Sequence, residues 1–379
     1  MKIALIDEFH NERAKSGIGR YTFELLRALN SLESDISLLA LAKKGEEQPD
    51  EKNVKILEGC SCPILNRTFN WQFYYPRIIP EEYDVYHTTN PFLIRTVAGR
   101  ENSVVTIHDM GLFELDEHKF PHSLSPYYLF SWLHRSLLIK YINHVSHIIA
   151  ISEYTKNRLI KILGIHTNKI SVIYHGVNDS FRPLDKTECR QTLNIPLDKR
   201  VLLYIGTELP KKNVETLMEA LRKLIHKRTD VLLIRIGARS ARIAKLIKKC
   251  RLDNHIRYFN NIGDDMLPLF YNAADIFIFP SVYEGFGLPL LESMACGTPV
   301  VAANASCFPE IISDAGLLFH PKNFSELADK IQGLLSNKQL MRELIQKGRE
   351  RASEFMWRKT ALLTREVYRK LYGNNKQIR

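Results

Sequence analysis

The sequence is poor in cysteine and has no long hydrophobic run. Its 379 residues include six cysteines, of which only Cys60 and Cys62 lie close together, and no Cys-x-x-Cys pair occurs. Scattered thiols are typical of a reducing compartment and predict neither a disulfide framework nor a zinc site. No apolar run reaches the roughly 18 residues that a membrane-spanning helix needs, and the first residues lack the long apolar segment of a signal peptide. These absences predict a cytoplasmic protein without a metal site.

Positive charge is in excess, and the excess lies in the second half of the chain. The formal net charge is +11; residues 1–180 carry −1 and residues 181–379 carry +12. Such a distribution favours a polyanionic ligand. Nucleic acid is one such polyanion, but no nucleic-acid-binding motif occurs, so we predict no nucleic-acid partner. A chain of this length fits two domains of roughly 180 residues each.

The most informative stretch spans residues 275–292. Residues 275–280 form a short apolar run with aromatic and β-branched side chains, which predicts a buried parallel strand. Gly285 and Gly287 follow, and Pro289 suits the start of a helix. A glycine loop that leads into a helix N-terminus favours a diphosphate, because the unpaired N–H groups and the helix dipole attract negative charge.

Two carboxylates frame this loop. Glu284 precedes the glycines, and Glu292 lies one turn into the predicted helix. The two can therefore contact opposite ends of a ligand whose phosphates lie between them. A carboxylate can accept hydrogen bonds from both hydroxyls of a sugar diol. The alternative interpretation is a solvated loop with two surface glutamates.

The start of the chain predicts a doubly wound domain. A strand over residues 3–9 is followed by Gly17 and Gly19, predicted to form a turn, and by a helix predicted from Thr22. The dinucleotide fingerprint Gly-x-Gly-x-x-Gly is incomplete, because Thr22 occupies the third position. An ordinary tight turn explains these glycines equally well.

Two further positions are candidates for ligand contact. His108 ends a predicted strand that begins at Ser103, and ligands of α/β sheets bind beyond the carboxyl ends of strands; a structural histidine is the alternative. Lys211 and Lys212 precede a helix predicted from Val214. Ammonium groups beside a helix N-terminus can hold a diphosphate, although exposed lysines usually have no ligand.

The stretch around Glu284 and Glu292 resembles the Glu-x7-Glu signature of the retaining glycosyltransferases of the GT-B fold, in particular family 4. The likeness continues through residues 294–301, and Thr106-Ile107-His108-Asp109 is similar to another motif of this family. The resemblance implies an α/β fold of two facing Rossmann-like doubly wound domains with a cleft between them. It implies an acceptor-binding domain at 1–180, a nucleotide-sugar-binding domain at 181–355, and a C-terminal helix at 356–379 that crosses back to the first domain.

The resemblance also implies roles for individual residues. Glu284 would contact the donor sugar, His108 would approach it from the other domain, and Lys212 would contact the phosphates. Glu292 would hold the ribose hydroxyls. The implied donor-binding residues are Gly17, Gly19, Lys211, Lys212, Asn261, Ile262, Glu284, Gly285, Phe286, Gly287, Leu288 and Glu292, of which Asn261 and Ile262 would border the nucleobase.

The chain departs from the family pattern in two places. Thr207 stands where an arginine commonly contacts the phosphates, and Lys211 or Arg239 could take over that contact. His175 and Asn178 occur within a segment that usually reads Asn-Gly-Val-Asp.

The implied activity is transfer of a hexose, with retention, from a GDP- or UDP-linked sugar to a hydroxyl of a saccharide or lipid-linked saccharide. No metal cofactor is expected, because Lys212, loop N–H groups and a helix dipole can neutralise the leaving diphosphate. Two segments, residues 106–109 and residues 206–213, are similar to those of bacterial mannosyltransferases of surface polysaccharide assembly. A nicotinamide-dependent dehydrogenase is disfavoured by the incomplete fingerprint, while a sugar-nucleotide epimerase and a non-catalytic binding subunit of the same fold remain alternatives.

Residues 119–169 are basic and rich in aromatic side chains. They contain seven Lys or Arg residues and one acidic residue, Glu153. Such a segment is typical of an amphipathic surface on an anionic membrane, which would suit a lipid-linked acceptor and a peripheral position at the inner face of the plasma membrane. A helix packed against the sheet is the alternative.

Overall fold

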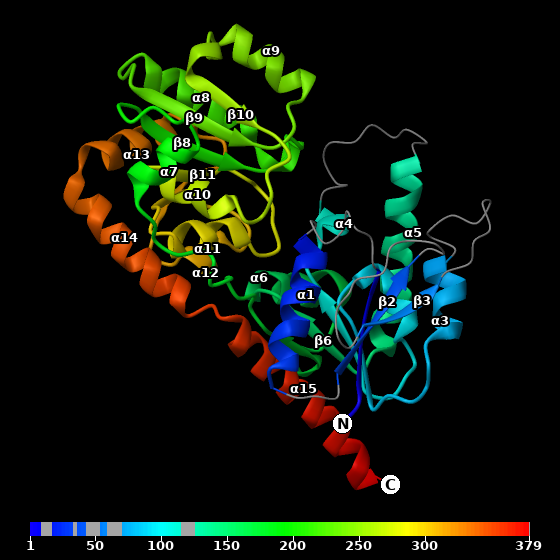
Figure 1. The fold of residues 1–379 in the computed structure, drawn as a ribbon. Helices are drawn as coiled ribbons and strands as arrows, with labels where there is room; N and C mark the ends of the chain where they lie inside the picture. Colours follow the sequence, from blue (N-terminus) through cyan, green and yellow to red (C-terminus); the bar gives the residue numbers. More distant parts are fainter. Residues whose placement is uncertain (9–16, 33–35, 43–53, 59–69, 115–125, 379) are drawn as a thin grey trace. The chain divides into compact units, whose positions relative to one another are not determined.

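The computed structural model describes residues 1–8, 17–32, 36–42, 54–58, 70–114 and 126–378. The chain forms two compact units, each built on one sheet (Figure 1). The first unit consists of Met1–Gly176 together with Trp357–Arg379, and the second consists of Val177–Met356. The second unit thus begins close to residue 180, where the sequence predicts a domain boundary.

The first unit contains a seven-stranded parallel sheet. Its strands are β1 (Ile3–Glu8), β2 (Ile36–Ala42), β3 (Val54–Glu58), β4 (Val85–Thr88), β5 (Ser103–Ile107), β6 (His147–Ala150) and β7 (Ile170–Val172). They lie in the order β3-β2-β1-β4-β5-β6-β7, and Ile3 of β1 pairs with Ile36 of β2 and Val85 of β4. The strand order reverses between β1 and β4, which is where ligands bind to open α/β sheets.

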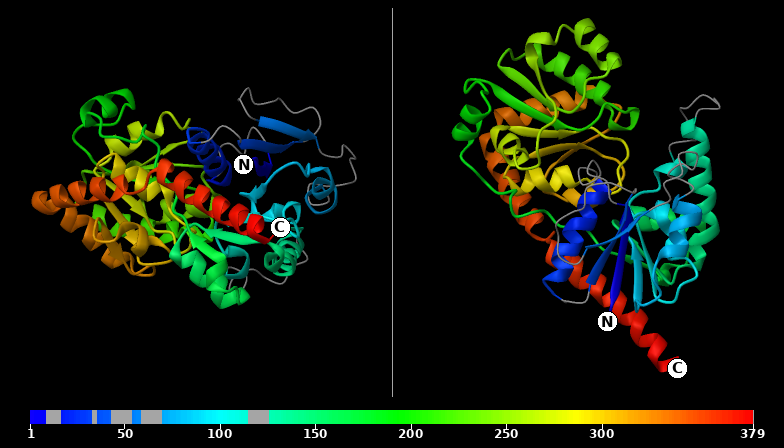
Figure 2. Two further views of the ribbon diagram at one scale, coloured as in Figure 1. Left: turned by 90° about the horizontal axis from the view of Figure 1, so that it is seen from below. Right: turned by 45° about the vertical axis from the view of Figure 1, so that its right-hand side comes forward.

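Helices cover both faces of this sheet (Figure 2). They are α1 (Gly17–Asn30), α3 (Tyr75–Ile78), α4 (Gly111–Glu114), α5 (Pro126–Tyr141), α6 (Glu153–Leu163) and α15 (Trp357–Ile378), with short helical turns η1 (Asn70–Tyr74), η2 (Pro91–Thr96), η3 (Ile142–His144) and η4 (Thr167–Lys169). One core contains Leu25 of α1 and Tyr368 of α15. The other core contains Trp71 of η1, Leu138 of α5 and Leu159 of α6. Each face of the sheet is therefore buried.

The start of α1 corrects the sequence interpretation of Gly17 and Gly19. Both glycines lie within the helix, whereas the sequence predicts a turn there and a helix only from Thr22. The helix extends back to Gly17 because Tyr21 is buried one helical turn before Leu25 and continues the apolar stripe. Ser152 is the N-cap of α6, where its hydroxyl accepts a hydrogen bond from the N–H of Thr155.

The second unit contains a six-stranded parallel sheet. Its strands are β8 (Arg200–Ile205), β9 (Val231–Ile236), β10 (Ile256–Phe259), β11 (Ile276–Phe279), β12 (Val300–Ala303) and β13 (Leu317–Phe319), in the order β10-β9-β8-β11-β12-β13. The order reverses between β8 and β11, so the switch point of this sheet lies between these two strands. The α/β doubly wound class that the sequence predicts is confirmed in both units.

The helices of the second unit follow its strands in turn. They are α7 (Lys186–Thr192), α8 (Val214–Ile225), α9 (Ala241–Lys249), α10 (Leu267–Ala273), α11 (Leu288–Ala295), α12 (Phe308–Ile312), α13 (Phe324–Ser336) and α14 (Lys338–Ser353), with short helical turns η5 (Pro210–Lys212) and η6 (Asp253–His255). Helix α8 packs on α13, and α11 packs on α14.

Two observations concern the predicted relation of the chain to a membrane. No helix among the described residues is long and apolar enough to cross a membrane. Of the basic segment 119–169, residues 119–125 lie outside the described residues, and the remainder forms α5, β6 and α6 with their connections.

Candidate functional site

In the second unit, two loops leave the sheet at its switch point. The first loop, 206–213, follows β8, and the second loop, 280–287, follows the neighbouring strand β11. The backbone N–H of Val282 donates to the carbonyl of Lys211 over 2.8 Å, which joins the two loops. Their side chains therefore share one edge of the sheet, where parallel α/β proteins bind ligands.

The side chain of Asn213 ties the first loop to the sheet. Its amide nitrogen donates to the carbonyl of Pro280 over 3.1 Å and to that of Pro321 over 2.8 Å. Its backbone has a φ of 52°, in the left-handed region that asparagine tolerates better than most residues. Lys211 and Lys212 form the end of η5 immediately before this residue. The turn therefore positions both lysines at the same edge of the sheet as the second loop.

Lys212 and Glu284 contact each other directly. The Nζ atom of Lys212 lies 2.5 Å from Oε1 of Glu284, and both side chains are less than one fifth exposed, at 18% and 17%. The Lys212 ammonium also lies 5.8 Å from the centroid of the Phe279 ring. Two residues that the sequence singles out 72 positions apart thus form one ion pair.

The backbone of Glu284 is held from outside the predicted motif. The N–H of Glu284 donates to Oγ of Ser306 over 3.2 Å, and the Ser306 hydroxyl donates back to the carbonyl of Glu284. Ser306 lies between β12 and α12 and has a φ of 55°. Reasoning from the sequence missed Ser306, because its position next to Glu284 depends on the pairing of β12 with β11.

Gly287 forms the N-cap of α11 with a φ of 100°. A Cβ atom at this residue would lie 3.0 Å from Cδ1 of Leu290, so glycine suits both the backbone conformation and the available space. Pro289 lies in the first turn of α11, as predicted. No side chain caps the N-terminus of α11, which directly follows the loop that carries Glu284.

Glu292 lies inside α11 and is buried. Its Oε2 atom accepts a hydrogen bond of 2.7 Å from the hydroxyl of Tyr271, which lies on α10. The sequence predicts Glu292 as a ligand-binding residue, and the structure adds Tyr271 as the group that orients its carboxylate. No feature of the sequence alone pairs these two residues.

The remaining donor-binding candidates of this unit differ in their surroundings. Gly285 and Leu288 are half-buried beside Glu284, whereas Phe286 is buried and its ring lies 6.0 Å from that of Phe355. Asn261 and Ile262 follow β10 at the edge of the sheet, and β9 and β8 separate that strand from β11. The structure thus groups Gly285 and Leu288 with the ion pair and positions Asn261 and Ile262 along the same edge but further away.

In the first unit, His108 follows the carboxyl end of β5. Its Nε2 atom donates to the carbonyl of Thr89 over 2.8 Å, which leaves Nδ1 as the ring nitrogen with a lone pair. Burial lowers the pKa of His108 to about 4, against the opposing effects of the Thr89 carbonyl and the Asp109 charge. A neutral imidazole at neutral pH can accept a hydrogen bond but cannot supply a positive charge.

A chain of hydrogen bonds leads from the start of α1 to His108. The Thr22 hydroxyl donates to Oδ2 of Asp7 over 2.7 Å and lies 2.7 Å from the hydroxyl oxygen of Thr89. These contacts join the carboxyl ends of β1 and β4 to α1. Gly17 and Gly19 lie in the first turn of that helix, so they reach the same edge of the sheet as His108.

Aromatic rings surround His108. The Tyr21 ring centroid lies 5.0 Å from that of His108, and the His175 centroid lies 5.8 Å from it. His175 in turn stacks on Trp357 of α15, with centroids 5.8 Å apart. His175, which departs from the family pattern, is therefore packed beside His108. Among the described residues, no group of three His, Cys, Asp or Glu side chains is arranged to hold a metal ion.

The architecture and the two candidate sites define a class of protein. Two doubly wound units, with Lys212 and the Glu284-x7-Glu292 pair at the switch point of the second, agree with the GT-B fold that the sequence resemblance implies. Two family models match the chain: "Glycosyltransferase Family 4" over residues 15–181 and "Glycosyl transferases group 1" over residues 185–351. The chain belongs to this glycosyltransferase family and is a glycosyltransferase.

Individual known proteins agree with this assignment. O-antigen chain mannosyltransferase B of Escherichia coli is 29% identical over 297 residues, which are 76% of this chain and 74% of that protein. The sucrose-phosphate synthase structure from Thermosynechococcus elongatus has a TM-score of 0.78 and 23% identity, over 99% of this chain and 100% of the other. Anabaena HepE in complex with UDP and glucose has a TM-score of 0.74 and 19% identity, over 97% and 99%. The two solved structures support the fold.

Proposed function

We propose that the protein transfers a hexose, with retention of the anomeric configuration, from a nucleoside-diphosphate sugar to a hydroxyl of a saccharide or lipid-linked saccharide. The observation that carries this proposal is the contact between Lys212 and Glu284 beside the uncapped N-terminus of α11. A cation, a helix N-terminus without a side-chain cap and a carboxylate at one sheet edge complement a diphosphate that is followed by a sugar.

The chemistry of the transfer follows from these groups. The Lys212 ammonium and the N–H groups of α11 would stabilise the charge that develops on the departing diphosphate. Glu284 would accept hydrogen bonds from sugar hydroxyls, and Glu292 from the ribose. The acceptor hydroxyl would attack the face from which the diphosphate departs, and a phosphate oxygen would take its proton. No protein nucleophile and no metal ion enter this scheme.

Mannose is the sugar that we propose for the donor. The support comes from relatives: O-antigen chain mannosyltransferase B matches over most of its length, and serotype-specific mannosyltransferase WbdA of Escherichia coli is 28% identical over 61% of this chain. Anabaena HepE was solved with UDP and glucose, so a UDP-linked donor is tested alongside a GDP-linked one.

The proposal is tested by incubating the purified full chain with a panel of GDP- and UDP-sugars, with and without an extract of bacterial membrane lipids. We expect one donor to release nucleoside diphosphate, and the rate to rise when the lipid extract is present. Proton NMR of the early product should show the anomeric configuration of the donor. Inversion would refute retention, and nucleotide binding without turnover on any donor would favour a non-catalytic subunit.

We further propose that α5 contacts an anionic membrane surface. Trp132 and Ile139 lie two turns apart on this helix and are 55% and 50% exposed, and the neighbouring Lys140 is exposed as well. Apolar and basic side chains on one exposed helix are typical of interfacial binding. Sedimentation with vesicles should show binding to phosphatidylglycerol but not to phosphatidylcholine, and Trp132→Ser should weaken it; equal binding by the variant would refute this contact.

A further inference from the structure

A buried ion pair connects loop 206–213 to the neighbouring strand β9. The guanidinium of Arg235, on β9, contacts Glu208 of the loop, with 3.1 Å between Nη2 and Oε1 and side-chain exposures of 0% and 1%. The same guanidinium lies 4.9 Å from the ring centroid of Tyr204 and 5.3 Å from that of Tyr258. These residues belong to β8, β9 and β10, near the carboxyl ends of the strands.

The Glu208 carboxylate links three segments of the second unit. Besides Arg235, it accepts a hydrogen bond of 3.2 Å from the hydroxyl of Tyr258 and one of 2.5 Å from the N–H of Ser240, the N-cap of α9. The backbone carbonyl of Glu208 accepts a further bond of 2.9 Å from Nη2 of Arg242. The conformation of the loop at Glu208 is thus determined by β9, β10 and α9 together.

The same network also holds the backbone of the first two residues of the loop. Nη2 of Arg235 donates to the carbonyl of Gly206 over 3.1 Å, and the Tyr204 hydroxyl donates to the carbonyl of Thr207 over 2.9 Å. A Cβ atom at Gly237 would lie 2.4 Å from the Gly206 carbonyl oxygen. The first residues of the loop therefore pack closely against β9, a few residues before Lys212.

Stability alone does not account for this pair. Nε and Nη1 of Arg235 are buried and have no hydrogen-bond partner among the described residues. A buried ion pair is often no more stabilising than apolar residues of similar volume, and unpaired buried donors add to its cost. The effect of the pair that the structure does show is the geometry it imposes on the loop.

We propose that Glu208 and Arg235 are positioning residues that hold loop 206–213 in the conformation in which Lys212 contacts the donor diphosphate. This inference rests on the proposed function of Lys212. The fixed position of Lys212 matters because a small displacement of a group that contacts the reacting diphosphate can lower the rate strongly.

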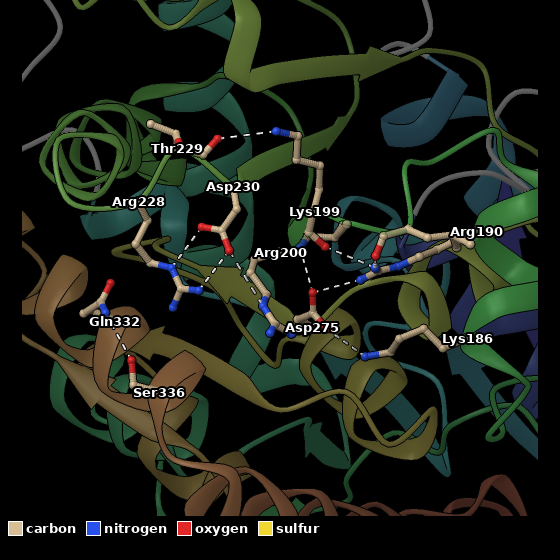
Figure 3. A network of polar contacts seen from close by, with 12 residues as sticks. Lys186, Arg190, Lys199, Arg200, Arg228, Thr229, Asp230, Asp275, Gln332 and Ser336 are labelled. Atoms are coloured by element: carbon tan, nitrogen blue, oxygen red, sulfur yellow. Dashed lines mark hydrogen bonds and ion pairs between the residues drawn. The ribbon is translucent and has the colours of Figure 1, made fainter.

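A second buried ion pair in the same unit provides the control (Figure 3). Arg190 and Asp275 contact each other over 2.8 Å, and Asp275 also accepts a hydrogen bond of 2.7 Å from the N–H of Val201. Asp275 immediately precedes β11 and Val201 lies at the start of β8, so this pair lies at the amino edge of the sheet. It resembles Glu208–Arg235 in chemistry and burial but lies at the edge opposite to the loop.

The experiment compares Glu208→Leu, Arg235→Met and the double variant with the wild-type chain. Each single variant leaves one buried charge unpaired and should lower the Tm, whereas the double variant should recover most of the loss. Hydrogen exchange of the 206–213 amides should nevertheless be faster in the double variant than in the wild type, and kcat/KM for the donor should fall by about 100-fold. Wild-type exchange rates and kcat/KM in a double variant of recovered Tm would overturn the proposal.

Two further variants keep the test independent of folding and of the donor. Tyr204→Phe removes only the hydroxyl that bonds to the Thr207 carbonyl, and it should accelerate exchange in the same loop even if the double variant does not fold. Arg190→Met should lower the Tm without accelerating exchange at 206–213. Because loop exchange is measured without nucleotide, an inactive wild-type chain would refute the proposed function while the exchange data still decide whether Glu208 and Arg235 position the loop.

Discussion

Lys212 and Glu284 neutralise each other, and this has a consequence for nucleotide binding. In Glu284→Ala, Lys212 loses its partner at 2.5 Å and becomes fully available to a diphosphate. We therefore expect the Kd for the free nucleoside diphosphate to stay the same or decrease, while kcat falls by at least about 100-fold because the sugar loses its carboxylate partner. Calorimetric titration and donor turnover measure the two effects separately.

Lys212→Ala is the matched control for this prediction. It should weaken nucleoside diphosphate binding and lower turnover together, because the contact that it removes is to the phosphates. Weakened diphosphate binding in Glu284→Ala would contradict the assignment of Glu284 to the sugar.

The sequence predicted both members of this ion pair but not the contact between them. Glu284 follows a recognisable apolar strand and Lys212 precedes a recognisable helix, and such local patterns are visible in one chain. The contact depends on the pairing of β8 with β11, which residues 206–275 separate in the sequence. The same limit explains why Tyr271 and Ser306, which orient Glu292 and Glu284, were not found.

At the scale of elements, Gly287 determines how α11 begins. Its φ of 100° and the close approach to Leu290 predict that Gly287→Ala destabilises the second unit by about 1–3 kcal/mol and weakens nucleoside diphosphate binding. Gly333 supplies a control of opposite sign, because it lies in α13 with open space around it. Gly333→Ala should raise stability by about 0.5–1 kcal/mol and leave binding unchanged. Chemical denaturation and nucleotide titration check both; a stabilised Gly287→Ala would contradict the argument.

A buried hydrogen bond joins helix α15 to the sheet of the first unit. Nδ1 of His87, on β4, lies 2.5 Å from the hydroxyl of Tyr368, and both residues are fully buried. Tyr368→Phe retains the ring and removes the hydroxyl, so we expect a loss of about 1–3 kcal/mol, since the His87 nitrogen is left unpaired. Val367→Ala, at a neighbouring buried position, should lower stability without exposing a polar atom. Faster hydrogen exchange along α15 in Tyr368→Phe alone would show that the hydrogen bond attaches the helix.

The apolar stripe of α15 was predictable, but its polar contact was not. The sequence predicts an apolar stripe of Trp357, Leu362, Leu363, Val367, Tyr368 and Leu371. Trp357, Val367 and Tyr368 are buried as predicted, whereas the three leucines are only half-buried. The start of α1 was predicted wrongly because glycine usually marks a turn; in this chain, the burial of Tyr21 outweighs the poor helix propensity of Gly17 and Gly19. Propensity is a local quantity, and packing across a sheet overrides it.

For the whole molecule, buried histidines make stability depend on pH. Burial lowers the pKa of His87 to about 3, and that of His108 to about 4. Burial, together with the nearby charges of Lys370 and Lys169, lowers the pKa of His147 to about 4. The unfolded chain binds protons at these residues as the pH falls below about 6.5, whereas the folded chain does not until the lower values are reached.

The free energy of unfolding should therefore decrease as the pH falls from about 6.5 to about 4, by up to about 1.4 kcal/mol per pH unit for each such histidine. His147→Gln should flatten this dependence, because glutamine does not titrate. Ser171→Ala removes the 2.9 Å contact to Nε2 of His147 but keeps the imidazole, so it should preserve the slope while shifting the curve. Denaturant unfolding at a series of pH values measures both slopes. Parallel curves for the wild type and His147→Gln would contradict the linkage. A histidine that is protonated in the unfolded chain and neutral in the folded chain must release its proton on folding, and this release gives the wild-type curve its extra slope.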